Sequence, residues 1–226
     1  MNIVVCIKQV LYTDGPLGID RAKKSIDARH VPLVINPYDE MAVEEALRLK
    51  EASLTGQLTV VSLGDSASEK ALRHCLAMGA DRAVLLTDPA FASSDGYVTG
   101  VILAKAISLM NFGLILCGAR AMDTNGGQVG AVVAEQLGIP MVTAVAKIES
   151  PTDGRKITVQ RKLERGYREV VEVELPVLLA IEVGHKPRYP SFPARVSAQK
   201  KVIDYYNAER LGLKPDEAGV TAAKTT

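Results

Sequence analysis

Short apolar runs alternate with longer segments of helical spacing through the first two-thirds of the chain. The runs predict strands at Ile3–Ile7, Leu58–Leu63, Ala83–Leu86, Leu114–Cys117 and Val142–Val145. They are mostly apolar and most are rich in β-branched residues, which is typical of buried parallel strands. Strands that alternate with helices predict an α/β fold, a doubly wound parallel sheet covered on both faces.

The segments between these strands carry helix signals. Helices are expected over Glu40–Lys50, Ser66–Met78, Asp95–Met110 and the residues from Val129 to Leu137. Asp39 is the expected N-cap of the first helix, and Ser66 with Glu69 forms a capping-box pattern at the start of the second. Gly79 and Gly138 are the expected stop signals of the second and fourth helices.

The pattern changes after Lys147. Residues 156–175 alternate polar and apolar positions around Glu164–Tyr167, which predicts a β-hairpin, and Val177–Ile181 predicts a further apolar strand. Residues 1–183 are therefore expected to form one domain. Residues 184–226 contain several prolines and little periodic apolar content, so they predict an extended arm, with a disordered end at Ala218–Thr226.

A glycine-rich turn between a predicted strand and a predicted helix is the most informative stretch. Residues 118–140 read GARAMDTNGGQVGAVVAEQLGIP, and Gly126, Gly127 and Gly130 leave the backbone open to a ligand. Free N–H groups and the helix dipole at such a helix start favour a bound phosphate. The stretch matches neither GxGxxG nor GxxxxGK[ST], so a tight turn without a ligand is the alternative.

Other polar residues are expected at the same sheet edge, because ligands of open parallel sheets lie beyond the carboxyl ends of the strands. These residues are Lys8 and Gln9 after the first strand, Ser62–Asp65 at the end of the second, and Asn36–Asp39 before a helix. Together with the glycine-rich turn they predict a nucleotide site. Turn and cap chemistry is the plainer explanation of each residue taken singly.

Composition narrows the classes of function. Lys and Arg number 27 against 26 Asp and Glu, so no overall field favours nucleic acid or a membrane surface. No segment approaches the length of a membrane span, and three cysteines in apolar contexts favour the reducing cytoplasm. The three histidines (His30, His74 and His185) belong to no recognisable ligand or catalytic pattern, which argues against a self-contained enzyme.

Several motifs in order resemble the β subunit of electron transfer flavoproteins over nearly the whole chain. They are VCIKQV at Val5–Val10, INPYDEMAVEEALRLKE at Ile35–Glu51, LAMGADRAVLL at Leu76–Leu86, DTNGGQVG with AEQLGIP, VQRKLERGYREVVEVELPVLLA at Val159–Ala180, and KPRYPSFPA at Lys186–Ala194. The resemblance implies an adenine nucleotide alpha hydrolase-like fold. It also implies an electron carrier that pairs with an α subunit bearing the redox-active FAD.

The family's β subunit holds an adenine nucleotide, a structural AMP in most members and a second, redox-active FAD in electron-bifurcating members. The contacts that the resemblance transfers to this chain are Cys6, Asn36, Pro37, Tyr38, Asp39, Leu63, Asp123, Thr124, Asn125, Gly126, Gly127, Gln128, Val129 and Gly130. Bifurcating members usually read close to DGDTAQVGP at the turn. Here Asn125-Gly126 replaces the Asp-Thr pair and Ala131 the proline, which favours AMP, whereas INPYD is closer to the FAD type.

The resemblance also implies a docking residue for an acyl-CoA dehydrogenase partner. The family places a large apolar residue before a proline after the PRY motif, and here these are Phe192 and Pro193. Arg195, Lys200 and Lys201 would be charges at the rim of that interface. Packing of Phe192 on its own subunit is the alternative. A stand-alone nucleotide-binding stress or signalling module is the rival from another class, and the hairpin and proline-rich arm count against it.

Overall fold

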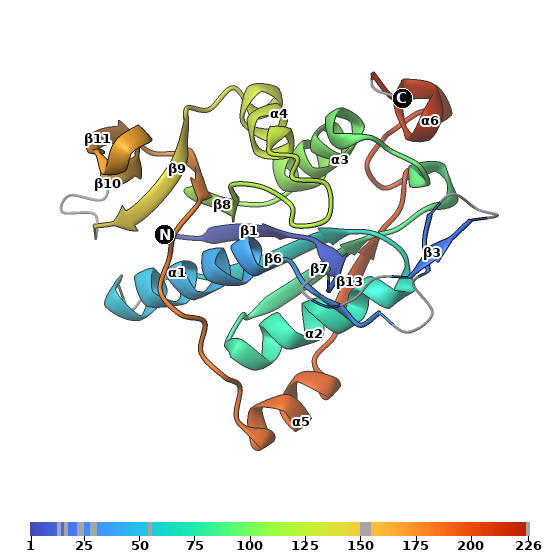
Figure 1. The fold of residues 1–226 in the computed structure, drawn as a ribbon, viewed down its shortest axis with the longest axis horizontal. Helices are drawn as coiled ribbons and strands as arrows, with labels where there is room; N and C mark the ends of the chain where they lie inside the picture. Colours follow the sequence, from blue (N-terminus) through green and yellow to red (C-terminus); the bar gives the residue numbers. More distant parts are fainter. Residues whose placement is uncertain are drawn as a thin grey trace.

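The computed structural model describes residues 1–12, 15, 18–21, 25–27, 31–53, 56–149 and 155–224. The strands of its main sheet are β1 (Ile3–Ile7), β6 (Leu58–Leu63), β7 (Arg82–Leu86), β8 (Leu114–Gly118), β9 (Met141–Ile148), β10 (Lys156–Lys162), β11 (Arg168–Glu174), β12 (Val177–Ile181) and β13 (Ile203–Tyr206). Their order across the sheet is β11-β10-β9-β12-β8-β1-β6-β7-β13 (Figure 1). The pairs from β9 to β13 in that order are parallel, and β10 and β11 add an antiparallel hairpin.

Helices cover both faces of the sheet, as a doubly wound fold requires. They are α1 (Pro37–Ser53), α2 (Glu69–Met78), α3 (Gly96–Ser108), α4 (Gln128–Leu137), α5 (Phe192–Lys200) and α6 (Gly219–Ala222). The pair α1 and α2 lies on one face and the pair α3 and α4 on the other, while α5 packs outside α2 (Figure 1). The predicted fold class is confirmed.

Smaller elements complete the described chain. Two short ribbons pair β2 (Gln9–Leu11) with β5 (Leu33–Ile35) and β3 (Ile19–Asp20) with β4 (Ser25–Ile26). Single 3₁₀ turns lie at η2 (Ser66–Ser68), η3 (Pro89–Phe91), η4 (Glu164–Gly166) and η5 (Pro215–Glu217).

The core has two layers, one on each side of the sheet. In β1, Val5 packs in the cluster under α1 and α2, whereas Val4 packs in the cluster under α3 and α4. Every residue of β1 is buried, which explains why its sequence is a continuous apolar run without polar alternation. Burial of each such side chain contributes about 1.5–3 kcal/mol to folding.

Two predicted helix caps are wrong. Helix α1 begins at Pro37, whose fixed φ suits the first helical position, so Asp39 lies inside the helix and does not cap it. The capping box of Ser66 is also not formed, because the chain first makes a 3₁₀ turn. Asp65 caps that turn by accepting a hydrogen bond from the N–H of Ala67.

The hairpin is confirmed, but the C-terminal segment is more ordered than expected. Helix α5 and strand β13 were not predicted, and β13 pairs with β7 as the outermost strand of the sheet. Disorder from Ala218 onward is wrong through residue 224, because Ala218 is buried and α6 follows it. Residues 225 and 226 lie outside the described part. The contacts of α5 with α2 and of β13 with β7 join segments that are distant in the sequence, so local periodicity does not reveal these elements.

Candidate functional site

A cavity of about 520 Å³ lies at the carboxyl ends of β1, β6 and β8, where the sequence placed a nucleotide. It is lined by Cys6, Ile7, Lys8, Asn36, Asp39, Leu63, Ser94, Asp95, Gly96, Thr99, Leu103, Cys117, Gly118, Arg120, Ala121, Thr124, Gly126, Gly127, Gln128, Val129 and Gly130. Its walls are therefore strand ends on one side and the first turns of α3 and α4 on the other. This is the place where an open parallel sheet binds ligands.

Ten of the fourteen predicted nucleotide contacts line this cavity. They are Cys6, Asn36, Asp39, Leu63, Thr124, Gly126, Gly127, Gln128, Val129 and Gly130. The other four lie next to the lining: Pro37 and Tyr38 start α1, Asp123 pairs with Lys8 at 2.7 Å, and Asn125 occupies a left-handed turn position. Phe192 and Pro193 lie elsewhere, at the start of α5.

Asn36 fixes the shape of the turn that precedes α4. Its amide nitrogen donates to the carbonyl of Arg120 at 2.9 Å, and its amide oxygen accepts from the N–H of Met122 at 3.1 Å. Within the turn, the N–H of Asn125 donates to the carbonyl of Ala121, and Asn125 has φ of 53°. Asn36 is only 1% exposed, so the turn is held by a buried residue of another segment. A turn built in advance lowers the entropic cost of binding.

Two glycines of the site are required by close packing of the protein itself. A Cβ on Gly127 would lie 2.7 Å from the carbonyl oxygen of Ala119. A Cβ on Gly118 would lie 2.6 Å from the Cβ of Tyr38 and would also overlap the Asp39 carboxylate. Gly118 therefore lets the start of α1 lie against the end of β8, a role that the sequence did not reveal.

Asp39 joins the ends of two neighbouring strands. Its carboxylate accepts hydrogen bonds from the backbone N–H of Lys8 at 2.7 Å and of Gly118 at 2.9 Å. The side chain is buried, and this burial raises the pKa of Asp39 to about 7 although both hydrogen bonds oppose the shift. Asp39 is thus a structural bridge at the floor of the cavity.

The cysteines of the cavity wall are neutral thiols. Burial, with the nearby Asp39 carboxylate as a smaller cause, raises the pKa of Cys6 to about 12. Burial also raises the pKa of Cys117 well above its ordinary value. A thiolate is the nucleophilic form of cysteine, so neither side chain is suited to covalent catalysis at neutral pH.

Cationic side chains at the rim are already paired. The ammonium of Lys8 contacts the carboxylate of Asp123, and the Lys8 side chain is half exposed, as expected at a solvated strand end. The guanidinium of Arg120 donates to the Tyr38 hydroxyl at 3.0 Å and to Glu182 at 2.7 Å. The remaining donors toward a phosphate are therefore backbone N–H groups at the start of α4 and lining side chains such as Thr99, Thr124 and Gln128.

Sequence reasoning missed the contribution of α3. Ser94, Asp95, Gly96, Thr99 and Leu103 line the cavity, and the Asp95 carboxylate caps α3 by accepting from the N–H of Val98 at 2.8 Å. A Cβ on Gly96 would lie 2.9 Å from the Cδ of Gln128, so the first turns of α3 and α4 are in contact. The predicted helix start near Asp95, after the strand that ends at Leu86, was the signal that could have identified this wall.

Metal ligands, histidines and membrane-spanning helices are the remaining features to place among the described residues. They include no group of three His, Cys, Asp or Glu side chains placed to hold a metal ion. His74 and His185 contact Glu40 and Glu45, and His30 lies outside the described residues. Over the same residues, no helix combines the length and the apolar character that crossing a membrane needs.

Comparison with known proteins identifies the family of this fold and cavity. The family model of the electron transfer flavoprotein domain matches residues 25–210. The chain is 45% identical to the electron transfer flavoprotein subunit beta of Thermoanaerobacterium thermosaccharolyticum and 41% identical to that of Clostridium acetobutylicum. It is 37% identical to the caffeyl-CoA reductase-Etf complex subunit CarD of Acetobacterium woodii. Each alignment covers all of this chain and 85% of the relative. The chain therefore belongs to the electron transfer flavoprotein family, as a β subunit.

Proposed function

We propose that the cavity holds AMP as a structural nucleotide and that the chain supports an FAD-bearing α subunit. The observation that carries this proposal is the start of α4 at Gln128, which lies in the cavity at the strand ends and has no side-chain cap at Gly127. Its backbone N–H groups and its helix dipole favour a phosphate there. Asp39 and the cavity thiols serve structure, which fits a nucleotide that is held and not transformed. Three buried free cysteines support a cytoplasmic location.

The nucleotide content of the purified heterodimer tests this proposal. We expect one AMP and one FAD per heterodimer after denaturation and chromatography of the released nucleotides. A heterodimer that contains FAD but no second adenine nucleotide, after purification without dialysis, would contradict the proposal.

FAD in the same cavity is the second candidate. It is favoured by the segment INPYD at Ile35–Asp39, which is closer to the sequences of the FAD type. The relative named as a subunit of a caffeyl-CoA reductase-Etf complex places a similar chain in a larger redox assembly. Two FAD and no AMP per heterodimer would select this candidate, and the subunit would then itself carry electrons.

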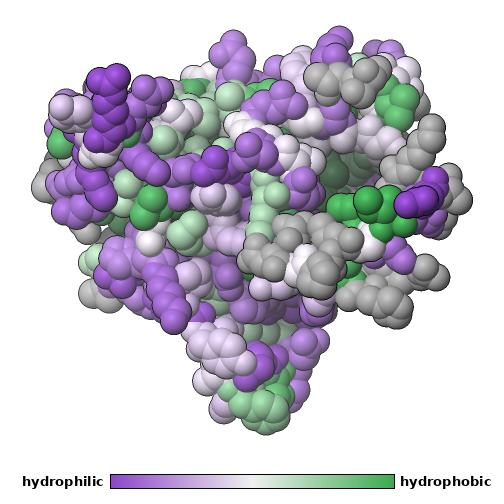
Figure 2. Space-filling model, viewed as in Figure 1, coloured by the Kyte–Doolittle hydropathy of each residue, from purple (hydrophilic) through white to green (hydrophobic). Residues whose placement is uncertain are grey.

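We also propose that the outer surface of α5 docks an acyl-CoA dehydrogenase. Phe192 is 73% exposed and Tyr189 is 81% exposed, with Val196 one helical turn further on. Figure 2 shows apolar side chains among polar ones at the protruding tip that α5 forms in Figure 1. An exposed aromatic residue of this kind can dominate a transient interface.

Phe192→Ala is expected to raise the KM of the heterodimer for an acyl-CoA dehydrogenase roughly tenfold, the scale of one aromatic anchor. The measurement is the rate of flavin reduction at varied dehydrogenase concentration with saturating acyl-CoA. Val202→Ala is the matched control, because Val202 is 80% exposed and lies beyond α5. An unchanged KM in the Phe192 variant would exclude α5 as the docking surface.

A further inference from the structure

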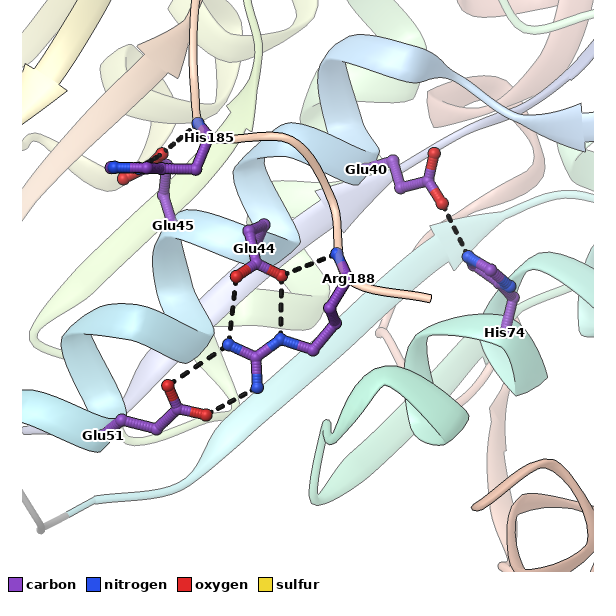
Figure 3. Close-up of polar contacts among 7 residues, drawn as sticks. All are labelled: Glu40, Glu44, Glu45, Glu51, His74, His185 and Arg188. Atoms are coloured by element: carbon purple, nitrogen blue, oxygen red, sulfur yellow. Dashed lines mark hydrogen bonds and ion pairs between the residues drawn. The ribbon is translucent and has the colours of Figure 1, made fainter. Parts of the chain in front are cut away.

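The connection from β12 to α5 is an irregular segment, residues 182–191, here called the strap. The strap lies along α1, to which charged groups attach it (Figure 3). Gly184 permits close approach, since a Cβ there would lie 3.1 Å from the Cβ of Met41 and 3.2 Å from a Glu45 carboxylate oxygen. The strap is therefore packed directly on the helix and does not cross open solvent there.

Arg188 makes the largest set of these contacts. Its Nε and Nη2 donate to the two oxygens of Glu44 at 2.8 and 3.0 Å, and its Nη1 and Nη2 donate to Glu51 at 2.5 and 3.2 Å. Its backbone N–H also donates to Glu44 at 3.1 Å. One guanidinium thus joins two carboxylates of α1, a geometry that a lysine ammonium does not reproduce.

A second contact lies three residues earlier in the strap. The backbone N–H of His185 donates to Glu45 at 2.7 Å, and its Nδ1 lies 2.7 Å from the same oxygen. Two main-chain N–H groups of the strap, those of His185 and Arg188, are thus satisfied by side-chain carboxylates of α1. Their exchange with solvent reports directly on whether the strap is attached.

The contact with Glu44 resists opening because this carboxylate is buried, with 4% exposure. Burial acts to raise the pKa of Glu44, yet the hydrogen bonds from Arg188 hold it below its ordinary value. Loss of Arg188 would leave a buried carboxylate without its partner, which is costly. The side chain of Glu51 is 60% exposed, so its share of the attachment is smaller.

The other end of α5 is attached to α2. Arg73 donates to the carbonyls of Ala198 and Lys201, each at 2.9 Å, and the Lys201 ammonium donates to the carbonyl of Ala80 at 2.8 Å. Lys201 is therefore a structural contact and not a free rim charge. Phe192 lies between the two attachments, four residues after Arg188.

We propose that Arg188 is a positioning residue that clamps the strap to Glu44 and Glu51 and thereby fixes the N-terminal end of α5 with its anchor Phe192. This inference rests on the proposed docking function of α5. A fixed anchor loses less conformational freedom when a partner binds, so the clamp strengthens docking without contact between Arg188 and the partner.

Hydrogen exchange of the full chain tests the attachment itself. In Arg188→Gln we expect the two strap amides that donate to carboxylates of α1, those of His185 and of position 188, to exchange roughly tenfold or more faster. In Arg188→Lys we expect an intermediate rate, because charge remains without the two-sided geometry. Lys147→Gln, which breaks the exposed pair with Glu149 at the end of β9, is the control. Unchanged protection of the strap in Arg188→Gln would overturn the clamp.

A double-mutant cycle with Phe192→Ala tests the effect on docking. Arg188→Gln is expected to raise the KM for an acyl-CoA dehydrogenase several-fold, roughly three- to tenfold, in the wild-type background and not in the Phe192→Ala background. Equal effects in both backgrounds, or none in either while Phe192→Ala alone raises KM, would overturn the positioning role. An unchanged KM in Phe192→Ala alone would instead overturn docking at α5, and the positioning role with it.

Discussion

Gly118→Ala is expected to destabilise the fold by about 3 kcal/mol and to remove the nucleotide that we propose for the cavity. The added Cβ would meet the Tyr38 Cβ at 2.6 Å and the Asp39 carboxylate. The Tyr38 Cβ is fixed to the backbone of α1, and the Asp39 carboxylate is buried and held by two backbone N–H groups, so the start of α1 must move away from β8. That movement breaks the hydrogen bond from the Gly118 N–H to Asp39 and displaces Asn36, which holds the turn before α4.

Urea unfolding and the nucleotide content of the purified heterodimer measure the two parts of this expectation. Gly138→Ala is the matched control, since Gly138 ends α4 at φ of 65° with no atom within 4 Å of an added Cβ. That variant should lose only about 1 kcal/mol, the cost of a left-handed alanine, and keep its nucleotide. Equal losses in both variants would show that close packing at Gly118 is unimportant.

Asp39→Asn is expected to change how stability depends on pH. The pKa of Asp39 is about 7 in the fold against 3.8 ordinarily, so the folded state holds an extra proton between these values. The contribution of Asp39 to the free energy of unfolding therefore falls as pH rises from about 4 to 7, by at most ~1.4 kcal/mol per pH unit, and is constant above pH 7. The asparagine does not titrate, so the difference between the two proteins should change by an amount on the order of 3 kcal/mol across this range.

Urea unfolding of both proteins between pH 4 and 8 measures this difference. Glu44→Gln serves as a control of opposite sign. Burial opposes the shift, but the hydrogen bonds from Arg188 hold the pKa of Glu44 below its ordinary value, so its contribution is lost as pH falls. Parallel pH profiles for wild type and Asp39→Asn would contradict the raised pKa of Asp39.

The elements that the sequence predicted well are those whose signals are local. β1 is buried on both faces, so its apolar run is unambiguous, and Gly138 in a left-handed conformation ends α4 as expected. The hairpin of β10 and β11 was predicted from the alternation of polar and apolar residues alone. The position of the cavity at the strand ends was also accessible, because strand ends of a parallel sheet converge wherever the fold is doubly wound.

Features that depend on contacts between distant segments were not accessible. Asp39 is of a residue type that often caps helices, and its position before a helical pattern suggested that role. Its partners are instead the N–H groups of Lys8 and Gly118, which lie 31 and 79 positions away in the sequence. Strand β13 is only four residues long and gains its partner from β7, so no periodic pattern marks it. Family resemblance supplied the expected role of Phe192, which composition and spacing alone would leave as one more exposed aromatic.

The strap and α5 connect β12, inside the sheet, to β13 at its edge. Both ends of this connecting segment are therefore continuous with strands of one sheet, in which β12 pairs with β8 and β9, and β13 pairs with β7. A partner that pulls on α5 would therefore pull on a segment held at both ends by strands of the sheet and not on a loose chain end. The proposed docking surface thus protrudes from the body while both of its ends continue into the sheet.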